Sequence, residues 1–114
     1  MGDSIRFRLT QDEVATLAQG GQLESLTRFS GEALAFVLEP NELNFEAHYA
    51  VGHVTVLVPR HLAQSWAQSD EEGLYQNQPV GGGTLRIAIE KDYACLHSEN
   101  KLENAGTFPN PKSV

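Results

Sequence analysis

Alternation of apolar and polar residues predicts a strand that leads straight into a short helix, and this unit occurs twice in the chain. A period of two is typical of a strand with one buried face. The alternating apolar positions are Ile5, Phe7 and Leu9 in the first copy and Val54, Val56 and Val58 in the second. The repeat therefore predicts one strand near the N-terminus and another near the middle of the chain.

Two different signals predict where the helices begin. Thr10 and Glu13 have the spacing of a capping box, in which each side chain accepts a hydrogen bond from the backbone N–H of the other residue. In the second copy Pro59 stands at or near the first helical turn, where its missing N–H would be unpaired in any case. Leu62 and Trp66 lie one turn apart and can share a face, so we expect Trp66 to anchor the core.

The rest of the pattern predicts further strands, most of them joined by short turns that favour antiparallel hairpins. Residues 69–83 are polar and rich in turn formers, which predicts a surface loop. The strands beyond the first are expected at residues 24–29, 33–39, 44–49, 53–58 and 84–90.

The predicted fold class is α+β, with a mainly antiparallel sheet of about six strands and two short helices. The element order is β-α-β-β-β-β-α-β, and curling toward a half-barrel is one way for such a sheet to protect its edges. With 114 residues the chain fits one domain. We expect that domain to span residues 1–96, followed by a polar tail over 97–114 that is either disordered or pinned by Phe108.

The charge balance narrows the choice of partners. A formal charge of −7, from 15 acidic and 8 basic side chains, disfavours nucleic acid and anionic membrane surfaces, because both attract clustered Lys and Arg. The apolar runs are too short for a transmembrane helix, and the N-terminus lacks the basic and apolar regions of a secretory signal. A soluble cytoplasmic protein is therefore expected. Its single cysteine, Cys95, cannot form an internal disulfide.

Three arginines are the first candidate binding residues. Arg6 and Arg8 project from one face of the first predicted strand, and Arg86 projects from the polar face of the last. If these strands are neighbours, the three guanidinium groups form a cluster suited to a carboxylate or phosphate. Glu46 and His48 alternate in the same way on another strand and are further candidates. The simpler interpretation is a solvated sheet face with cross-strand ion pairs.

Cys95 and His97 are candidate metal ligands, because one residue separates them and their side chains would point to the same side of a strand. Zinc sites need three or four protein ligands, however, and the alternative is a buried thiol beside a surface histidine. No cofactor is predicted. The glycine run 81–83 lacks the Lys and Ser or Thr of a phosphate-binding loop and precedes a strand instead of a helix.

Three segments, at residues 4–14, 90–97 and 108–111, together resemble an uncharacterised family of short bacterial proteins. The shared features are an arginine-bearing first strand, a Lys-Asp-aromatic-Ala-Cys-Leu segment and a Phe-Pro-Asn-Pro tail. The resemblance implies a single-domain protein and no particular activity. Residues 54–60 also resemble the strand-to-helix start of swapped-hairpin transcription factors, but an acidic run at 70–72 follows where a DNA-binding face would need basic residues.

The function predicted from these observations is a small binding or interaction module, without catalysis, that recognises a small anion or an acidic partner through the arginine-bearing face. The alternative is an enzyme acting on an anionic small molecule. An enzyme would require a concave pocket in which the arginines converge with Glu46 or His48. An interaction module would instead show a flat face or an unpaired strand edge, through which it could form a homodimer.

Overall fold

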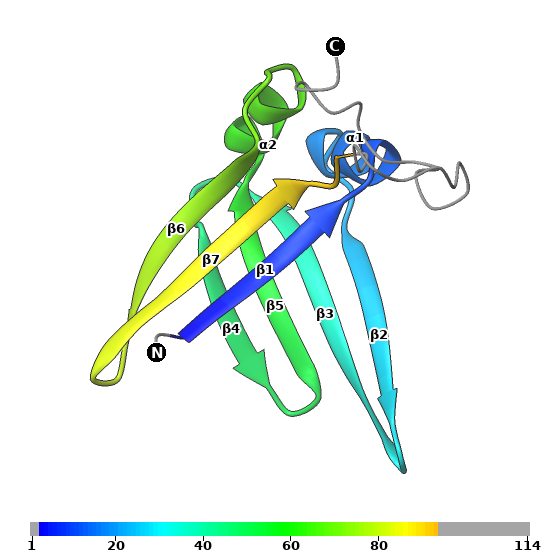
Figure 1. Cartoon of the computed structure of the whole chain (residues 1–114), viewed down its shortest axis with the longest axis vertical. Helices are drawn as coiled ribbons and strands as arrows, with labels where there is room; N and C mark the ends of the chain where they lie inside the picture. Colours follow the sequence, from blue (N-terminus) through cyan, green and yellow to red (C-terminus); the bar gives the residue numbers. More distant parts are fainter. Residues whose placement is uncertain (1–2, 94–114) are drawn as a thin grey trace.

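The computed structural model describes residues 3–93, which form seven strands and two helices (Figure 1). In chain order the elements are β1 (Asp3–Leu9), α1 (Gln11–Ala18), β2 (Leu23–Phe29), β3 (Glu32–Asn41), β4 (Glu46–Ala50), β5 (His53–Pro59), α2 (Arg60–Ala67), β6 (Gly73–Val80) and β7 (Gly83–Lys91). Neither helix is long and apolar enough to cross a membrane.

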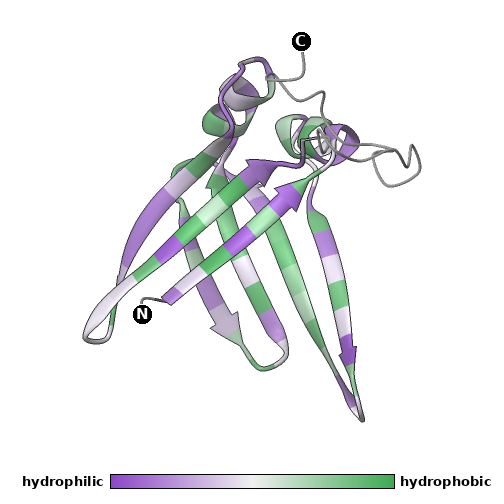
Figure 2. Ribbon diagram, viewed as in Figure 1, coloured by the Kyte–Doolittle hydropathy of each residue, from purple (hydrophilic) through white to green (hydrophobic). Residues whose placement is uncertain are grey.

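The strands form two sheets that pack face to face. The first sheet has the order β1-β7-β6 and the second has the order β2-β3-β5-β4. Their inward-facing side chains form one hydrophobic core, to which both sheets and both helices contribute. Figure 2 shows the resulting alternation of green and purple along β1, which is the period of a strand with one buried face.

The α+β class, both helices and their places in the chain are confirmed. The capping box is confirmed as well: the Thr10 N–H donates to Glu13 Oε1 at 2.9 Å, and the Glu13 N–H donates to Thr10 Oγ1 at 3.3 Å. The element order gains one strand, because residues 73–80 form β6, where a loop was expected. Two sheets replace the single sheet, and neither curls toward a half-barrel.

Two parallel pairings separate the observed topology from an antiparallel meander. β1 runs parallel to β7, and β5 runs parallel to β3. β4 pairs antiparallel with the other edge of β5, so β5 lies between β3 and β4. A helix follows each of β1 and β5: α1 carries the chain from β1 to β2 in the other sheet, and α2 carries it from β5 to β6. Neither β1 nor β5 therefore forms a hairpin with the strand that follows it, and each lies parallel to the second strand of a hairpin, β7 of β6–β7 or β3 of β2–β3.

The repeated unit is therefore longer than one strand and one helix. It is β-α-β-β, once as β1-α1-β2-β3 and once as β5-α2-β6-β7. The buried residues of α1 are Val14 and Leu17, and the buried residues of α2 are Ala63 and Trp66, at the same positions within each helix.

The two copies exchange their first strands. In one sheet Phe7 of β1 lies opposite Ile89 of β7, and in the other Val56 of β5 lies opposite Leu38 of β3. These two pairs occupy equivalent positions in the two copies. Each half of the chain thus supplies its first strand to the hairpin of the other half, with the same register.

The two helices pack against each other at one end of the sheets, as Figure 1 shows. Leu17 and Trp66 are 0% and 1% exposed there, and the Trp66 Nε1–H donates to the carbonyl oxygen of Glu71 at 3.0 Å. The expected role of Trp66 as a core anchor is confirmed.

Replacing Leu17 with alanine is expected to lower the free energy of unfolding by about 2–5 kcal/mol, because it removes a fully buried side chain and leaves a cavity. Urea denaturation followed by Trp66 fluorescence measures the change. Leu43→Ala is the matched control, since Leu43 is 84% exposed and its loss should cost less than about 0.5 kcal/mol. Equal effects of the two substitutions would contradict the observed core.

Candidate functional site

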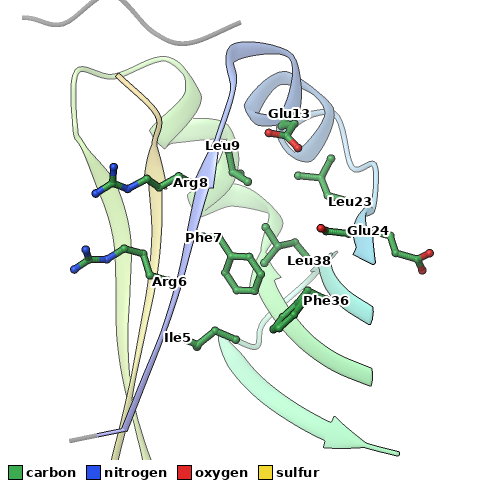
Figure 3. Close-up of a pocket in the computed structure, with 11 residues that line it drawn as sticks. Ile5, Arg6, Phe7, Arg8, Leu9, Glu13, Leu23, Glu24, Phe36 and Leu38 are labelled. Atoms are coloured by element: carbon green, nitrogen blue, oxygen red, sulfur yellow. The ribbon is translucent and has the colours of Figure 1, made fainter. Parts of the chain in front are cut away.

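The outer face of the three-stranded sheet brings the three predicted arginines together. β1 and β7 are neighbours, with Ser4 opposite Arg86, Arg6 opposite Ala88 and Arg8 opposite Glu90. The side chains of Ile5, Phe7 and Leu9 point into the molecule, so alternation places Arg6 and Arg8 on the other side of β1, as Figure 3 shows. We call the surface formed by Arg6, Arg8, Arg86, Tyr75 and Glu90 the arginine face.

Glu90 organises the arginine face. Its Oε1 lies 3.1 Å from Arg6 Nε, and its Oε2 accepts a hydrogen bond from the Tyr75 hydroxyl at 2.8 Å. The Arg86 guanidinium lies 5.1 Å from the centre of the Tyr75 ring, in a cation–π arrangement. Partial burial and the hydrogen bond to Glu90 raise the pKa of Tyr75 to about 12, so its hydroxyl remains a donor at neutral pH.

The arginine face carries excess positive charge. Glu90 neutralises Arg6, whereas Arg8 and Arg86 have no ion-pair partner within residues 3–93. A depression of about 310 Å³ lies on this side of the sheet and is lined by Ser4, Ile5, Arg6, Arg86 and Ala88. The arrangement thus offers guanidinium groups beside a shallow hollow, which suits a carboxylate or phosphate group.

Glu46 and His48 do not join the arginines. Both lie on β4, in the four-stranded sheet, and their nearest charged partners are each other, with His48 Nε2 3.4 Å from Glu46 Oε1. The local alternation that suggested them is present. However, they belong to the four-stranded sheet, whereas Arg6, Arg8 and Arg86 belong to the three-stranded sheet. The convergence that an enzyme would require is not found.

The predicted metal ligands Cys95 and His97 lie outside the described residues. Among residues 3–93, no group of three or more His, Cys, Asp or Glu side chains could hold a metal ion.

A second feature adjoins the arginine face: a groove of about 300 Å³ between β1 and β2 (Figure 3). Both strands are the outermost strands of their sheets. The groove floor is apolar and is formed by Ile5, Phe7, Leu9, Leu23, Phe36 and Leu38.

The opposite side of the molecule is closed by glutamines of β6. Gln78 spans to the other sheet, where its Oε1 accepts from the Ala47 N–H at 2.6 Å and its Nε2 donates to the Ala47 carbonyl at 2.9 Å. Gln76 Nε2 donates to the Phe45 carbonyl at 3.2 Å. Along the described chain the two sheets are therefore joined at the β4–β6 side and open at the β1–β2 side.

Lys91 belongs to one of the segments that suggested the family, and its side chain is buried against the segment after α2. It is 6% exposed, its Nζ donates to the Ser69 carbonyl at 2.6 Å, and it lies 5.7 Å from the centre of the Trp66 ring. Burial lowers the pKa of this amine. These contacts tie the end of β7 to the segment after α2.

Sequence reasoning missed Tyr75 and the two glutamines because they lie in the stretch predicted as a loop. A signal for Glu90 was present, since its position in the last predicted strand places it on the same face as Arg86. Its role depends on β1 and β7 being neighbours, which local alternation does not show.

The fold and site define a small α+β domain of two packed sheets, with an arginine face on one of them. The chain belongs to DUF7009, a family of unknown function whose model matches residues 1–112. The family resemblance drawn from the three sequence segments is thus confirmed. No curated protein and no solved structure matches the chain.

The ionisation of Tyr75 tests the network around Glu90. In a spectrophotometric titration, subtracting the curve of Tyr75→Phe should isolate a phenol that ionises near pH 12. Because the folded state raises this pKa above 10, the neutral hydroxyl stabilises the fold below pH 10, and this contribution is lost as pH rises through the folded pKa. Glu90→Gln removes the acceptor charge and should lower the Tyr75 pKa. An unchanged midpoint in Glu90→Gln would contradict the hydrogen bond.

Proposed function

We propose that this protein is a binding module that recognises an anionic group on the arginine face. The observation that carries the proposal is local positive charge on an acidic chain. The whole chain has a formal charge of −7, yet three guanidinium groups lie on one side of a three-stranded sheet, where the nearby carboxylates are Glu90, which pairs with Arg6, and Glu72, whose charge acts on Tyr75. A local field of this sign attracts anions to that face.

The neighbouring side chains hold two of the guanidinium groups in place before a ligand arrives. Arg6 is paired with Glu90, and Arg86 lies over the Tyr75 ring. Fixing these side chains in advance lowers the entropy lost on binding. Arg8 lies opposite Glu90 in register and is exposed, so its planar group is available for two parallel hydrogen bonds to a carboxylate or phosphate.

The same contacts favour recognition over catalysis. Glu90 is held by Arg6 and Tyr75, and the raised pKa of Tyr75 keeps that hydroxyl protonated at neutral pH, so the Tyr75 oxygen is not a general base. Among the described residues, the other candidate acid–base pair, Glu46 and His48, belongs to the opposite sheet. The geometry therefore supports a binding role.

The double substitution Arg6→Ala with Arg8→Ala is expected to abolish thermal stabilisation by inorganic phosphate and by succinate. Each lost charged hydrogen bond contributes about 1.5–3 kcal/mol, so the Kd for either anion should rise at least about tenfold. Differential scanning fluorimetry over a concentration series of each anion measures the shift in Tm.

Arg28→Ala with Arg60→Ala is the matched control. It changes the net charge by the same amount but removes arginines of β2 and α2, away from the arginine face. The control should respond to both anions as the unsubstituted protein does. An equal response of the two double variants would show that the arginine face is not the anion site.

A further inference from the structure

The first strands of the two repeated halves, β1 and β5, differ in how many described strands pair with them. In the second half β5 has a neighbour on each edge, with β3 parallel on one side and β4 antiparallel on the other. Its counterpart β1 pairs with β7 alone in the described part of the chain. The place beside β1 that corresponds to β4 therefore holds no described strand.

The backbone of β1 is arranged to receive a strand there. The Asp92 N–H donates to the Leu9 carbonyl at 2.9 Å, so the backbone groups of Leu9 face β7. Successive residues of a strand direct these groups to opposite edges. The N–H and C=O groups of Arg8 and Arg6 consequently face the outer edge of β1.

The groove beside this edge can take the inward side chains of an added strand. Its apolar floor includes Phe7 and Phe36, whose rings lie edge to face with centroids 6.2 Å apart. On the other side of the molecule, the corresponding space is filled by Phe45 and Ala47, which pack against the core. An incoming strand would therefore place apolar side chains where those two residues lie in the second half.

Polar side chains also stand at matching positions of β2 and β6. On β6, Gln76 and Gln78 bond the backbone of β4 across the sheets. On β2, Ser25 stands at the position of Gln76 and lines the groove. Its hydroxyl is placed to bond the backbone of a strand added beside β1.

The outward positions of the added strand would face the arginines. On β4, Glu46 lies opposite Leu57 and His48 lies opposite Thr55. The counterparts of Leu57 and Thr55 on β1 are Arg8 and Arg6. Opposite charges at such cross-strand positions stabilise a sheet, so acidic side chains are preferred there.

A second copy of this chain does not fit the same edge. Antiparallel pairing of β1 with its own copy would set Arg6 and Arg8 against the arginines of that copy, and like charges directly opposite each other destabilise a sheet. On the groove side, Glu13 and Glu24 line the rim and disfavour acidic residues at inward positions. The favoured segment thus alternates acidic and apolar residues.

From these observations we infer that β1 binds an extended, alternating acidic and apolar segment of a partner protein as an added antiparallel strand. Main-chain hydrogen bonds to the β1 edge would supply affinity, and the groove and the arginine face would supply specificity. The inference rests on the proposed function, since it names the class of ligand that the arginine face recognises.

The probe is a fluorescein-labelled peptide, Asn-Phe-Glu-Ala-Glu-Tyr-Ala, which copies residues 44–50 with glutamate in place of His48. When the full-length protein is added to this peptide, the fluorescence anisotropy of the label should rise and reach a plateau. Lysine in place of both glutamates should weaken binding at least tenfold, as should the protein variant Arg6→Ala with Arg8→Ala. The control Arg28→Ala with Arg60→Ala should bind the peptide normally.

Backbone methylation separates strand addition from simple attraction of charge. Methylating the N–H of the first glutamate removes a ladder bond and should weaken binding at least tenfold, although the charge is unchanged. Methylating the N–H of the alanine between the two glutamates is the matched control and should leave most of the affinity. This alanine corresponds to Ala47, whose N–H points away from β5 toward Gln78. Equal binding of the two methylated peptides would overturn strand addition while leaving anion recognition by the arginine face intact.

Three further outcomes would also overturn the inference. If phosphate stabilises the protein but the peptide does not bind, anion recognition by the arginine face would stand and the addition of a partner strand to β1 would be ruled out. A dimer that the peptide dissociates, seen by sedimentation, would assign the edge to a second copy. Binding that requires removal of residues 94–114 would assign the edge to this chain's own C-terminal segment.

Discussion

The exchange of first strands between the two halves of the chain is the contact on which the other features depend. Each hairpin, β2–β3 or β6–β7, gains a third strand only from the other half of the sequence. The helices make this possible, since each carries the chain across from one sheet to the other. Their mutual packing fixes both crossings at one end of the molecule, and Leu17 of α1 and Trp66 of α2 are buried in the shared core. Burial of these side chains thus stabilises both sheets together.

The departure from this symmetry coincides with the candidate site. β4 covers the outer edge of β5 and is held by Gln76 and Gln78 of the other sheet. Beside β1 the described chain has an apolar groove on the inner side and the arginine face on the outer side. The duplicated framework holds β1 in place, and the sheet without a fourth strand among the described residues carries the arginine face. Recognition of an anion and addition of a strand would use the two sides of the same element.

The limits of prediction from sequence follow from the physics of each element. Strands with inward Ile, Phe, Leu or Val were predictable, as was the capped start of α1. β6 was not predictable, because its inward positions include two polar residues, Gln76 and Gln78. These side chains hydrogen-bond the backbone at and beside β4 instead of filling the core. The grouping of Arg6, Arg8 and Arg86 depended on a pairing between the first and last described strands, which local alternation could only suggest. The same alternation could not show that Glu46 and His48 belong to the opposite sheet.

Hydrogen exchange of individual backbone amides, followed by NMR, tests most directly whether the outer edge of β1 is open. An open edge predicts fast exchange for Arg6 and Arg8, and slow exchange for Phe7, whose backbone N–H faces β7. Their counterparts on β5, Thr55 and Leu57, should be protected because they pair with β4. Protection of Arg6 and Arg8 equal to that of Thr55 and Leu57 in the unliganded protein would contradict the open edge.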